Sequence, residues 1–191
     1  MKVLLLGPER SEIIGALDKS GDEVEIIEKK LSVNDPIIQE VDFLISYGYR
    51  HILRKDILSK FQNKAINIHI SLLPWNRGAD PNLWSFLENT PKGVTIHYLD
   101  EGIDTGNILV QTETEFTNED TLRTSYEKLN ELAIELFQSS WLKIREGKIP
   151  SQPQPGGGSL HRLQDRERYK HLLTNGWDTP VINLIGKALS N

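Results

Sequence analysis

The order of apolar and polar positions along the chain predicts strands that alternate with helices. Residues 2–6 (KVLLL) and 42–46 (DFLIS) are short apolar runs, typical of strands buried on both faces, and residues 23–28 fit a further strand. Residues 11–19 instead repeat apolar side chains at the spacing of a helix. This alternation predicts an α/β fold, with a mostly parallel, Rossmann-like sheet flanked by helices.

The second half of the chain predicts two further helices. Residues 79–88 fit a short helix with Asp80 as its N-cap. In residues 117–146, apolar side chains recur every three or four positions and form one stripe, which predicts a single long helix. Thr117 and Asp120 have the spacing of a capping box, so we expect this helix to begin near them.

Proline and glycine fill residues 150–158, which breaks any regular pattern and predicts a linker. We therefore expect a main domain of residues 1–149. A linker and a short C-terminal segment would make up residues 150–191.

One stretch, residues 65–78, combines a strand pattern with polar side chains that suit chemistry. The two-residue period of a strand places Asn67 and His69 on one face and the intervening isoleucines on the other. Pro74 ends the strand, because proline cannot donate to a sheet ladder, and a loop with Arg77 follows. Open α/β sheets bind ligands at the carboxyl ends of their strands, so this polar pair is a candidate site. Two satisfied polar residues at a sheet edge are the alternative.

A second segment, residues 94–109, favours the functional interpretation. It has the pattern of a strand, an acidic turn that contains glycine, and another strand. Such a turn can bring Asp104 back over the end of a neighbouring strand. We therefore expect Asn67, His69 and Asp104 to meet in space.

Composition narrows the class of protein without naming one. The 191 residues contain no cysteine, which excludes a disulfide framework, a thiolate metal site and a catalytic thiol. The formal net charge of −5 argues against a nucleic-acid surface, which needs clustered Lys and Arg. No apolar run approaches ~20 residues, and the start of the chain fits a buried strand better than a signal peptide. We expect a cytoplasmic protein without a membrane partner.

Together these residues resemble the folate-dependent formyltransferase family. The resemblance rests on Asn67-Ile68-His69, on residues 71–74 (SLLP), on Arg77-Gly78, on His97 and on residues 104–108 (DTGNI). The family includes glycinamide ribonucleotide formyltransferase, methionyl-tRNA formyltransferase and the N-formyltransferases of nucleotide-linked amino sugars. The resemblance implies a Rossmann-like formyltransferase fold with residues 1–149 as the catalytic domain. It also implies transfer of a formyl group from 10-formyltetrahydrofolate to a primary amine.

The resemblance assigns roles to the polar residues of both segments. Asn67 would donate its amide N–H to the oxyanion, and His69 would take part in proton transfer or, when protonated, add to the stabilisation of the oxyanion. Asp104 would orient the imidazole and favour its charged form. His97, on a strand that looks buried, is a supporting residue beside the site. No metal is expected, because the five histidines show no paired ligand spacing.

Contacts to the two substrates also follow from the resemblance. The expected contacts to the folate donor are Tyr49, His51, Ile52, Leu53, Gly102, Ile103 and Asp104. The expected contacts to the acceptor are Trp75, Arg77, Gly78, Asn82, His161 and Arg162.

The acceptor is inferred mainly by elimination. Enzymes that act on glycinamide ribonucleotide use a glycine-rich first loop, and residues 7–10 (GPER) contain one glycine. The tRNA enzymes resemble longer chains with a further RNA-binding domain. A nucleotide-linked amino sugar is therefore the expected small-molecule acceptor, and a homodimer through the C-terminal segment is an expected assembly. A folate-binding module without catalysis is the alternative of another class.

Overall fold

The computed structural model describes residues 1–189, and its main feature is one six-stranded sheet. The sheet strands are β1 (Lys2–Leu6), β2 (Glu23–Ile27), β3 (Phe43–Ser46), β4 (Ala65–His69), β6 (Gly93–Tyr98) and β7 (Ile108–Glu113). The short strands β5 (Arg77–Gly78) and β8 (Leu160–His161) pair with each other in a second sheet. The α-helices are α1 (Ser11–Lys19), α2 (Ile37–Glu40), α3 (Lys55–Leu58), α4 (Pro81–Leu87) and α5 (Leu122–Arg145).

The strand order of the large sheet is β2-β1-β3-β4-β6-β7. The first four strands are parallel, and β6 is antiparallel to both β4 and β7. This arrangement confirms the mostly parallel sheet expected from the sequence. The centre of the sheet is shielded from solvent, since residues 3–6 of β1 have no exposed surface. Strand β4, which carries the Asn-x-His sequence, is parallel to β3 and antiparallel to β6, so the strand direction changes beside it.

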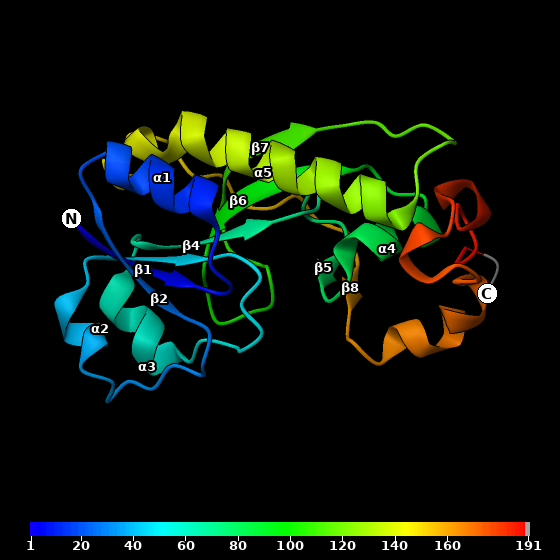
Figure 1. The fold of residues 1–191 in the computed structure, drawn as a ribbon. Helices are drawn as coiled ribbons and strands as arrows, with labels where there is room; N and C mark the ends of the chain where they lie inside the picture. The colour runs from blue at the N-terminus through cyan, green and yellow to red at the C-terminus, as the bar shows by residue number, and fades with distance from the viewer. Residues whose placement is uncertain (190–191) are drawn as a thin grey trace.

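Helices cover both faces of the sheet. Helices α1 and α5 lie on one face, and α2 and α3 lie on the other (Figure 1). Ile66 and Ile68 of β4 belong to the apolar cluster under α1 and α5, which contains Phe137 and Trp141. Ala65 belongs to the cluster on the opposite face. Alternate residues of β4 thus point to opposite faces, as the sequence predicts.

A third apolar cluster lies at the end of the molecule where the chain finishes. It joins α4 and the first turn of α5 to the C-terminal segment through Trp84, Phe86, Leu122, Val181 and Leu184. Figure 1 shows this segment beside α4, in orange and red. It consists of short 3₁₀ turns, η2 (Asp165–Leu172), η3 (Gly176–Asp178) and η4 (Val181–Asn183). The division of the chain at residue 150 stays a prediction.

One predicted helix cap is wrong in the structure, and a second has the expected position but lacks a side-chain hydrogen bond. Helix α5 begins at Leu122, and its capping box is formed by Thr121 and Thr124 rather than by the earlier pair. The carboxylate of Asp120 instead accepts hydrogen bonds from the backbone and hydroxyl of Thr117. Asp80 is the N-cap residue of α4, as expected, but its side chain does not cap the helix and its carboxylate instead accepts a hydrogen bond from Arg166 of the C-terminal segment.

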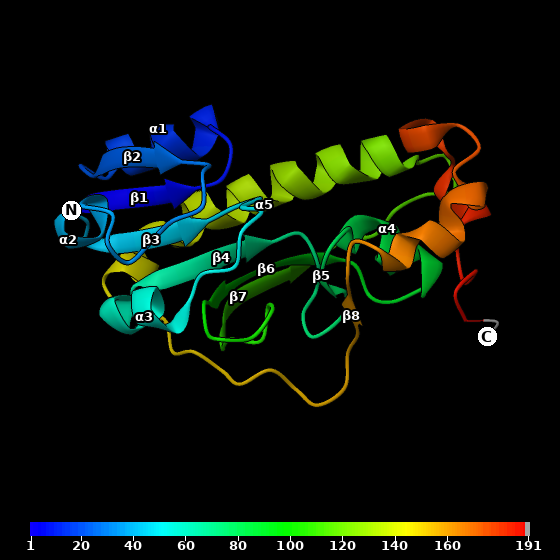
Figure 2. The ribbon, with the colours of Figure 1, turned by 90° about the horizontal axis from the view of Figure 1, so that it is seen from below.

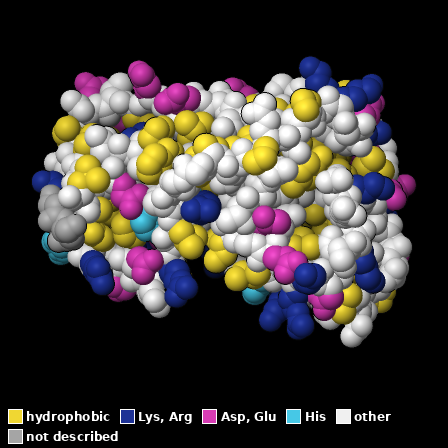
Figure 3. All heavy atoms as spheres, turned by 180° about the vertical axis from the view of Figure 1, so that it is seen from behind, with side chains coloured by type: hydrophobic (Ala, Val, Ile, Leu, Met, Phe, Trp, Pro, Cys, Tyr) yellow, Lys and Arg dark blue, Asp and Glu magenta, His cyan; other side chains and the backbone are white. Residues whose placement is uncertain are grey.

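Charged side chains are spread over the surface. On the face shown in Figure 3, Lys and Arg alternate with Asp and Glu instead of forming one large patch of a single sign. Among the described residues, none of the helices combines the length and apolar character needed to cross a membrane.

Candidate active site

Strands β4 and β6 hold the first three polar groups of the site in one register. Asn67 pairs with His97 across the antiparallel ladder, and His69 pairs with Thr95. The turn between β6 and β7 then returns the chain to this point. The carboxylate of Asp104, in that turn, lies between the side chains of β4 and β6. The three side chains expected to converge therefore do so.

Four groups surround the Asp104 carboxylate. Its Oδ1 accepts a hydrogen bond of 3.0 Å from the amide of Asn67 and lies 3.4 Å from Nε2 of His97. Its Oδ2 accepts a bond of 2.8 Å from the backbone N–H of Gly78 and lies 3.6 Å from Nδ1 of His69. Burial alone would raise the pKa of Asp104, but the two imidazoles and the N–H of Gly78 outweigh it and hold the pKa well below its usual range. The carboxylate is therefore ionised at neutral pH.

The hydrogen bonds of His69 determine its tautomer. Nε2 lies 3.0 Å from the backbone carbonyl oxygen of Asn76, and a carbonyl only accepts, so Nε2 carries the proton. Burial lowers the pKa of His69 below its ordinary value, and the Asp104 carboxylate opposes this effect only in part. His69 is therefore neutral near pH 7. Its free lone pair is on Nδ1, the nitrogen that faces Asp104.

His97 and Asn67 complete the network. Nδ1 of His97 donates to the carbonyl oxygen of Tyr98 at 2.8 Å, because a carbonyl only accepts, and this leaves Nε2 facing Asn67 and Asp104. Nδ2 of Asn67 lies 3.3 Å from this nitrogen and 3.0 Å from Asp104 Oδ1. His97 has no exposed surface. It therefore holds the amide of Asn67 in the orientation that points its N–H groups at Asp104 and His97.

The turn that carries Asp104 has a demanding backbone. Asp104 has a φ of 52°, in the left-handed region that side chains other than glycine rarely adopt. A Cβ on Gly106 would lie 1.8 Å from the carbonyl oxygen of Tyr98, so only glycine fits there. Asp100 Oδ1 also accepts hydrogen bonds from Gly102 N and Thr105 Oγ1. This backbone conformation fixes the direction in which the carboxylate of Asp104 points.

The residues expected to contact the donor lie on two loops that face each other. An ion pair of 2.7 Å between Lys55, the first residue of α3, and Glu101 joins the end of the first loop to the second. Two large apolar side chains are exposed on them, Ile52 at 69% and Ile103 at 39%. The other expected donor contacts differ in their surroundings.

Tyr49, another residue expected to contact the donor, is held by its hydroxyl, which accepts a hydrogen bond from Leu31 N and donates one to Lys29 O. Its ring meets that of His51 edge to face, at 5.2 Å between centroids. Leu53 is buried at 8% exposure. The two isoleucines therefore supply exposed apolar surface on these loops, and their contact with the donor stays a prediction.

One expected acceptor contact, Gly78, lies against Asp104, and two more, Arg77 and His161, lie on the β5–β8 pair that contains it. Gly78 binds the carboxylate directly, and β5 pairs with β8 so that Gly78 lies opposite His161. Arg77 binds the carbonyl oxygen of Ser159 through Nε at 3.3 Å. The His161 ring stacks on Trp84 with centroids 3.7 Å apart, and its Nε2 lies 3.1 Å from Glu88.

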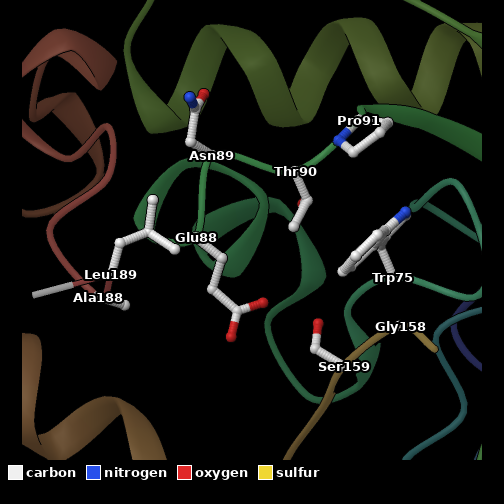
Figure 4. Close-up of a pocket in the computed structure, with 9 residues that line it drawn as sticks. All are labelled: Trp75, Glu88, Asn89, Thr90, Pro91, Gly158, Ser159, Ala188 and Leu189. Carbon is white, nitrogen blue, oxygen red and sulfur yellow. The ribbon is translucent and has the colours of Figure 1, made fainter. Parts of the chain in front are cut away.

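Three others lie apart from the carboxylate network. Asn82 is only 3% exposed, and its amide binds Leu122 O and Ser125 Oγ, so it fastens α4 to α5; its contact with the acceptor stays a prediction. The side chain of Arg162 is exposed. Trp75 lines a pocket of about 420 Å³ together with Glu88, Asn89, Thr90, Pro91, Gly158, Ser159, Ala188 and Leu189 (Figure 4). The side chains of Asn67, His69 and Asp104 do not line that pocket.

Sequence reasoning missed two residues that shape the site. Asn76 is fully buried, accepts from His69 and binds Ser71 and Thr90 through its own amide. Its φ of 56° is a conformation that asparagine tolerates better than most residues, which is the one local signal of its role. Gln154 reaches the site from a stretch that reads as a linker, and no local signal marks it.

Within residues 1–189, no cluster of three or more His, Cys, Asp or Glu side chains has the arrangement needed to hold an ion. The site is thus defined by one carboxylate, two imidazoles, a carboxamide and the backbone around them.

A Rossmann-like sheet with an Asn-x-His strand and an aspartate returned by a glycine-bearing turn defines a class of one-carbon group transferases. Comparison with known proteins agrees. The chain belongs to the formyl transferase family, whose N-terminal domain model matches residues 32–140.

Several relatives are similar to the chain. The formyltransferase PseJ from Anoxybacillus kamchatkensis is 57% identical, with a TM-score of 0.96 over 98% of this chain and 100% of that one. It was crystallised in complex with UDP-4,6-dideoxy-4-formamido-L-AltNAc and tetrahydrofolate. A sugar N-formyltransferase from a Shewanella species, at 22% identity, has the same fold, with a TM-score of 0.78 over 90% of this chain and 79% of that one.

Curated relatives match a shorter region. A methionyl-tRNA formyltransferase from Thermodesulfovibrio yellowstonii is 40% identical over 129 residues, which cover 67% of this chain and 40% of that protein. Three further curated relatives, from Anaeromyxobacter dehalogenans, Listeria monocytogenes and Prochlorococcus marinus, are methionyl-tRNA formyltransferases too, and the alignments cover less than half of each.

Proposed function

We propose that this protein transfers a formyl group from 10-formyltetrahydrofolate to the 4-amino group of a UDP-linked amino sugar. The observation that carries the proposal is the similarity to PseJ, which extends over 100% of that chain and whose bound sugar carries a formamido group at carbon 4. The Asn67, His69 and Asp104 network supports the same chemistry in this chain.

A tRNA acceptor is the competing proposal, because the curated relatives are methionyl-tRNA formyltransferases. Two observations favour the sugar. Identity rises from 40% over part of the chain to 57% over nearly all of it when the comparison is with PseJ. The net charge of −5 is also unfavourable for binding a polyanion such as tRNA.

His69 is the proposed proton acceptor. The reaction forms a bond between the acceptor nitrogen and the formyl carbon, breaks the bond from that carbon to N10 of the donor, and moves one proton from the amine to N10. Neutral His69 has a free lone pair on Nδ1, because Asn76 holds the proton on Nε2. Nδ1 would take the amine proton and pass it to the departing nitrogen, a contribution of about 100-fold or more to the rate.

Asp104 stabilises the charge that this step creates. Its Oδ2 lies 3.6 Å from Nδ1 of His69, so the imidazolium would form beside a carboxylate that is already ionised. Because the carboxylate is held by Gly78 and Asn67, it is in place before the proton arrives. Preorganisation of this kind costs no rearrangement at the moment of reaction.

Asn67 is the proposed oxyanion donor. One of its N–H groups is bound to Asp104 at 3.0 Å, and the other faces His97 at the longer distance of 3.3 Å. We propose that the second group turns to the carbonyl oxygen of the formyl group as negative charge develops there. A donor of this type is worth about 3–4 kcal/mol in a preorganised site.

The loops around Ile52 and Ile103 fit the donor. The donor supplies an activated one-carbon group on a flat, largely apolar ring system. Exposed apolar side chains on two loops joined by the Lys55–Glu101 ion pair would bind such a ring by burial. Backbone groups between Gly102 and Asp104 would supply polar contacts.

An acceptor panel tests the proposal. The purified protein is incubated with 10-formyltetrahydrofolate and, separately, with a UDP-4-amino-4,6-dideoxy sugar, its dTDP analogue, glycinamide ribonucleotide and methionyl-tRNA. We expect donor consumption and a formamido product with the UDP-sugar and much slower turnover with the others. Turnover confined to methionyl-tRNA would refute the sugar assignment, and binding of the donor without any turnover would support a non-catalytic module.

Assembly and location belong to the same proposal. We propose a homodimer through the C-terminal segment, where Leu160, Leu163 and Ile182 are exposed at 46%, 59% and 47%. Sedimentation velocity would give twice the 21.8 kDa of one chain for the dimer. A sedimentation coefficient of a single chain would contradict it. The cytoplasm is the proposed location.

A further inference from the structure

Residues 150–155 (PSQPQP), which we call the strap, lie against the edge of the sheet and do not hang free. The backbone N–H and carbonyl of Gln152 exchange two hydrogen bonds of 2.8 Å with Ile108, at the start of β7. Three prolines restrict the backbone of the strap. Figure 2 shows this part of the chain leaving the end of α5 and running along the β7 side of the sheet towards β8.

Gln154 connects the strap to the turn that carries Asp104. Its side-chain nitrogen Nε2 donates to the backbone carbonyl oxygen of Asp104 at 2.7 Å and to that of Gly106 at 2.9 Å. Both acceptors belong to one turn, 48 and 50 residues earlier in the sequence. One side-chain amide thus binds the backbone carbonyl groups of the residues directly before and after residue 105.

The orientation of this amide is forced. Two carbonyl oxygens can accept only from N–H groups, so the nitrogen of Gln154 must face the turn. Its oxygen Oε1 is then buried without a hydrogen-bond partner among the described residues. A buried oxygen without a partner carries a free-energy cost, so the two bonds on the nitrogen side determine the conformation.

The turn needs such support because its backbone is unfavourable on its own. Asp104 has its φ of 52°, and Gly106 passes against the carbonyl oxygen of Tyr98 where no side chain fits. The carboxylate meets Asn67, Gly78 and both imidazoles only while this backbone course is kept.

We propose that Gln154 is a positioning residue for formyl transfer, which fixes the Asp104 carboxylate against His69 and Asn67 by holding the carbonyl groups of the turn. The inference rests on the proposed function for its link to catalysis. Gln154 touches neither His69 nor Asn67 and is not a catalytic residue. It lies outside residues 32–140, the region matched by the family model.

The test compares matched substitutions at two positions of the strap. Gln154→Met keeps the length of the side chain and removes both donors. Gln152→Met makes the same chemical change at an exposed side chain for which the structure records backbone hydrogen bonds only. We expect Gln154→Met to lower kcat by about 10- to 100-fold, as a displaced catalytic group does, and Gln152→Met to leave it unchanged.

The pKa of His69, measured by NMR from the shift of its ring protons against pH, separates positioning from general damage. The charged or titratable groups that face His69 are Asp104, from the turn, and His97, from β6; the Asn76 carbonyl holds its other nitrogen. The Asp104 carboxylate raises this pKa, so a turn that drifts away lowers it. We expect a lower pKa of His69 in Gln154→Met than in wild type and Gln152→Met.

Three results would overturn the inference. They are an unchanged kcat in Gln154→Met, equal losses in both methionine variants, and a lost kcat with an unchanged pKa of His69. If Gln154→Met fails to fold, Gln154→Glu replaces it, because an ionised carboxylate of the same shape cannot donate. A wild-type protein that transfers no formyl group would refute the proposed function, while the His69 measurement would still decide the role of Gln154.

Discussion

The position of one proton on His69 determines what this side chain can do. The carbonyl oxygen of Asn76 holds the hydrogen on Nε2, so the basic nitrogen is Nδ1, beside Asp104. Burial keeps the ring neutral, and the ionised carboxylate nearby favours its protonation once substrate supplies a proton. These opposed effects suit a group that must accept a proton and then release it.

This balance predicts how the rate depends on pH. The pKa of His69 lies below its ordinary value of 6.5, and the lone pair is available only above that pKa. With acceptor saturating, kcat should therefore be constant through neutral pH and fall only when the pH drops below 6.5. Asp104 stays ionised throughout, because its pKa is held well below its usual range. An acid limb of kcat centred above 6.5 would contradict this assignment of the base.

At this scale the sequence predicted the side chains that carry charge but not the groups that hold them. Asn67, His69 and Asp104 could be predicted, because a two-residue strand period and a glycine-bearing turn place them. Asn76 could not, because it acts through its backbone oxygen. Gln154 could not, because its two hydrogen bonds reach 48 and 50 residues back along the chain.

At the scale of elements, the turn between β6 and β7 is the part on which the site depends most. Its strands were predictable from β-branched alternation, and its acidic and glycine residues marked it as a turn. Helix α5 was predictable as a stripe of apolar residues, but its N-cap was misplaced by four residues, at Thr117 instead of Thr121. Residues 117–120 and residues 121–124 both have the spacing of a capping box. The packing of Leu122 in the third apolar cluster decides which of them begins the helix.

Gly106→Ala tests the geometry of this turn. The added Cβ would lie 1.8 Å from the carbonyl oxygen of Tyr98, so the turn must move and carry Asp104 with it. We expect kcat to fall by about 100-fold. Gly156→Ala is the control, because a Cβ there meets nothing within 4 Å. Equal activity of the two variants would show that the turn is not fixed as described.

At the scale of the whole molecule, one buried carboxylate fastens the start of the sheet to the end of the longest helix. Asp22 has a fully buried side chain that accepts from Trp141 Nε1, from Arg145 and from the amino group of Met1. Burial opposes its charge, but these donors lower its pKa below the ordinary 3.8. The layered α/β architecture was predictable from sequence periodicity, whereas this contact, 119 residues apart, was not.

Asp22→Asn should lower the free energy of unfolding by roughly 1–3 kcal/mol at pH 7, since it weakens bonds to charged donors in a buried place. Urea denaturation of the variant measures this, with the exposed Asp18→Asn as control. The pH dependence of this stabilisation follows from the lowered pKa of Asp22. The contribution is present above 3.8 and is lost as the pH falls through the folded value, so wild type and variant should converge in acid. A difference that persists below that range would rule out the ionic contribution.

The most direct test of the account is the single-turnover rate of formyl transfer in Asp104→Asn. Because the carboxylate stabilises protonated His69 and holds Asn67, we predict a rate about 100-fold or more below wild type with little change in melting temperature. Asp18→Asn, which removes the same charge from an exposed position, should react like wild type. A folded Asp104→Asn protein that transfers formyl groups to the UDP-sugar at the wild-type rate would contradict the account.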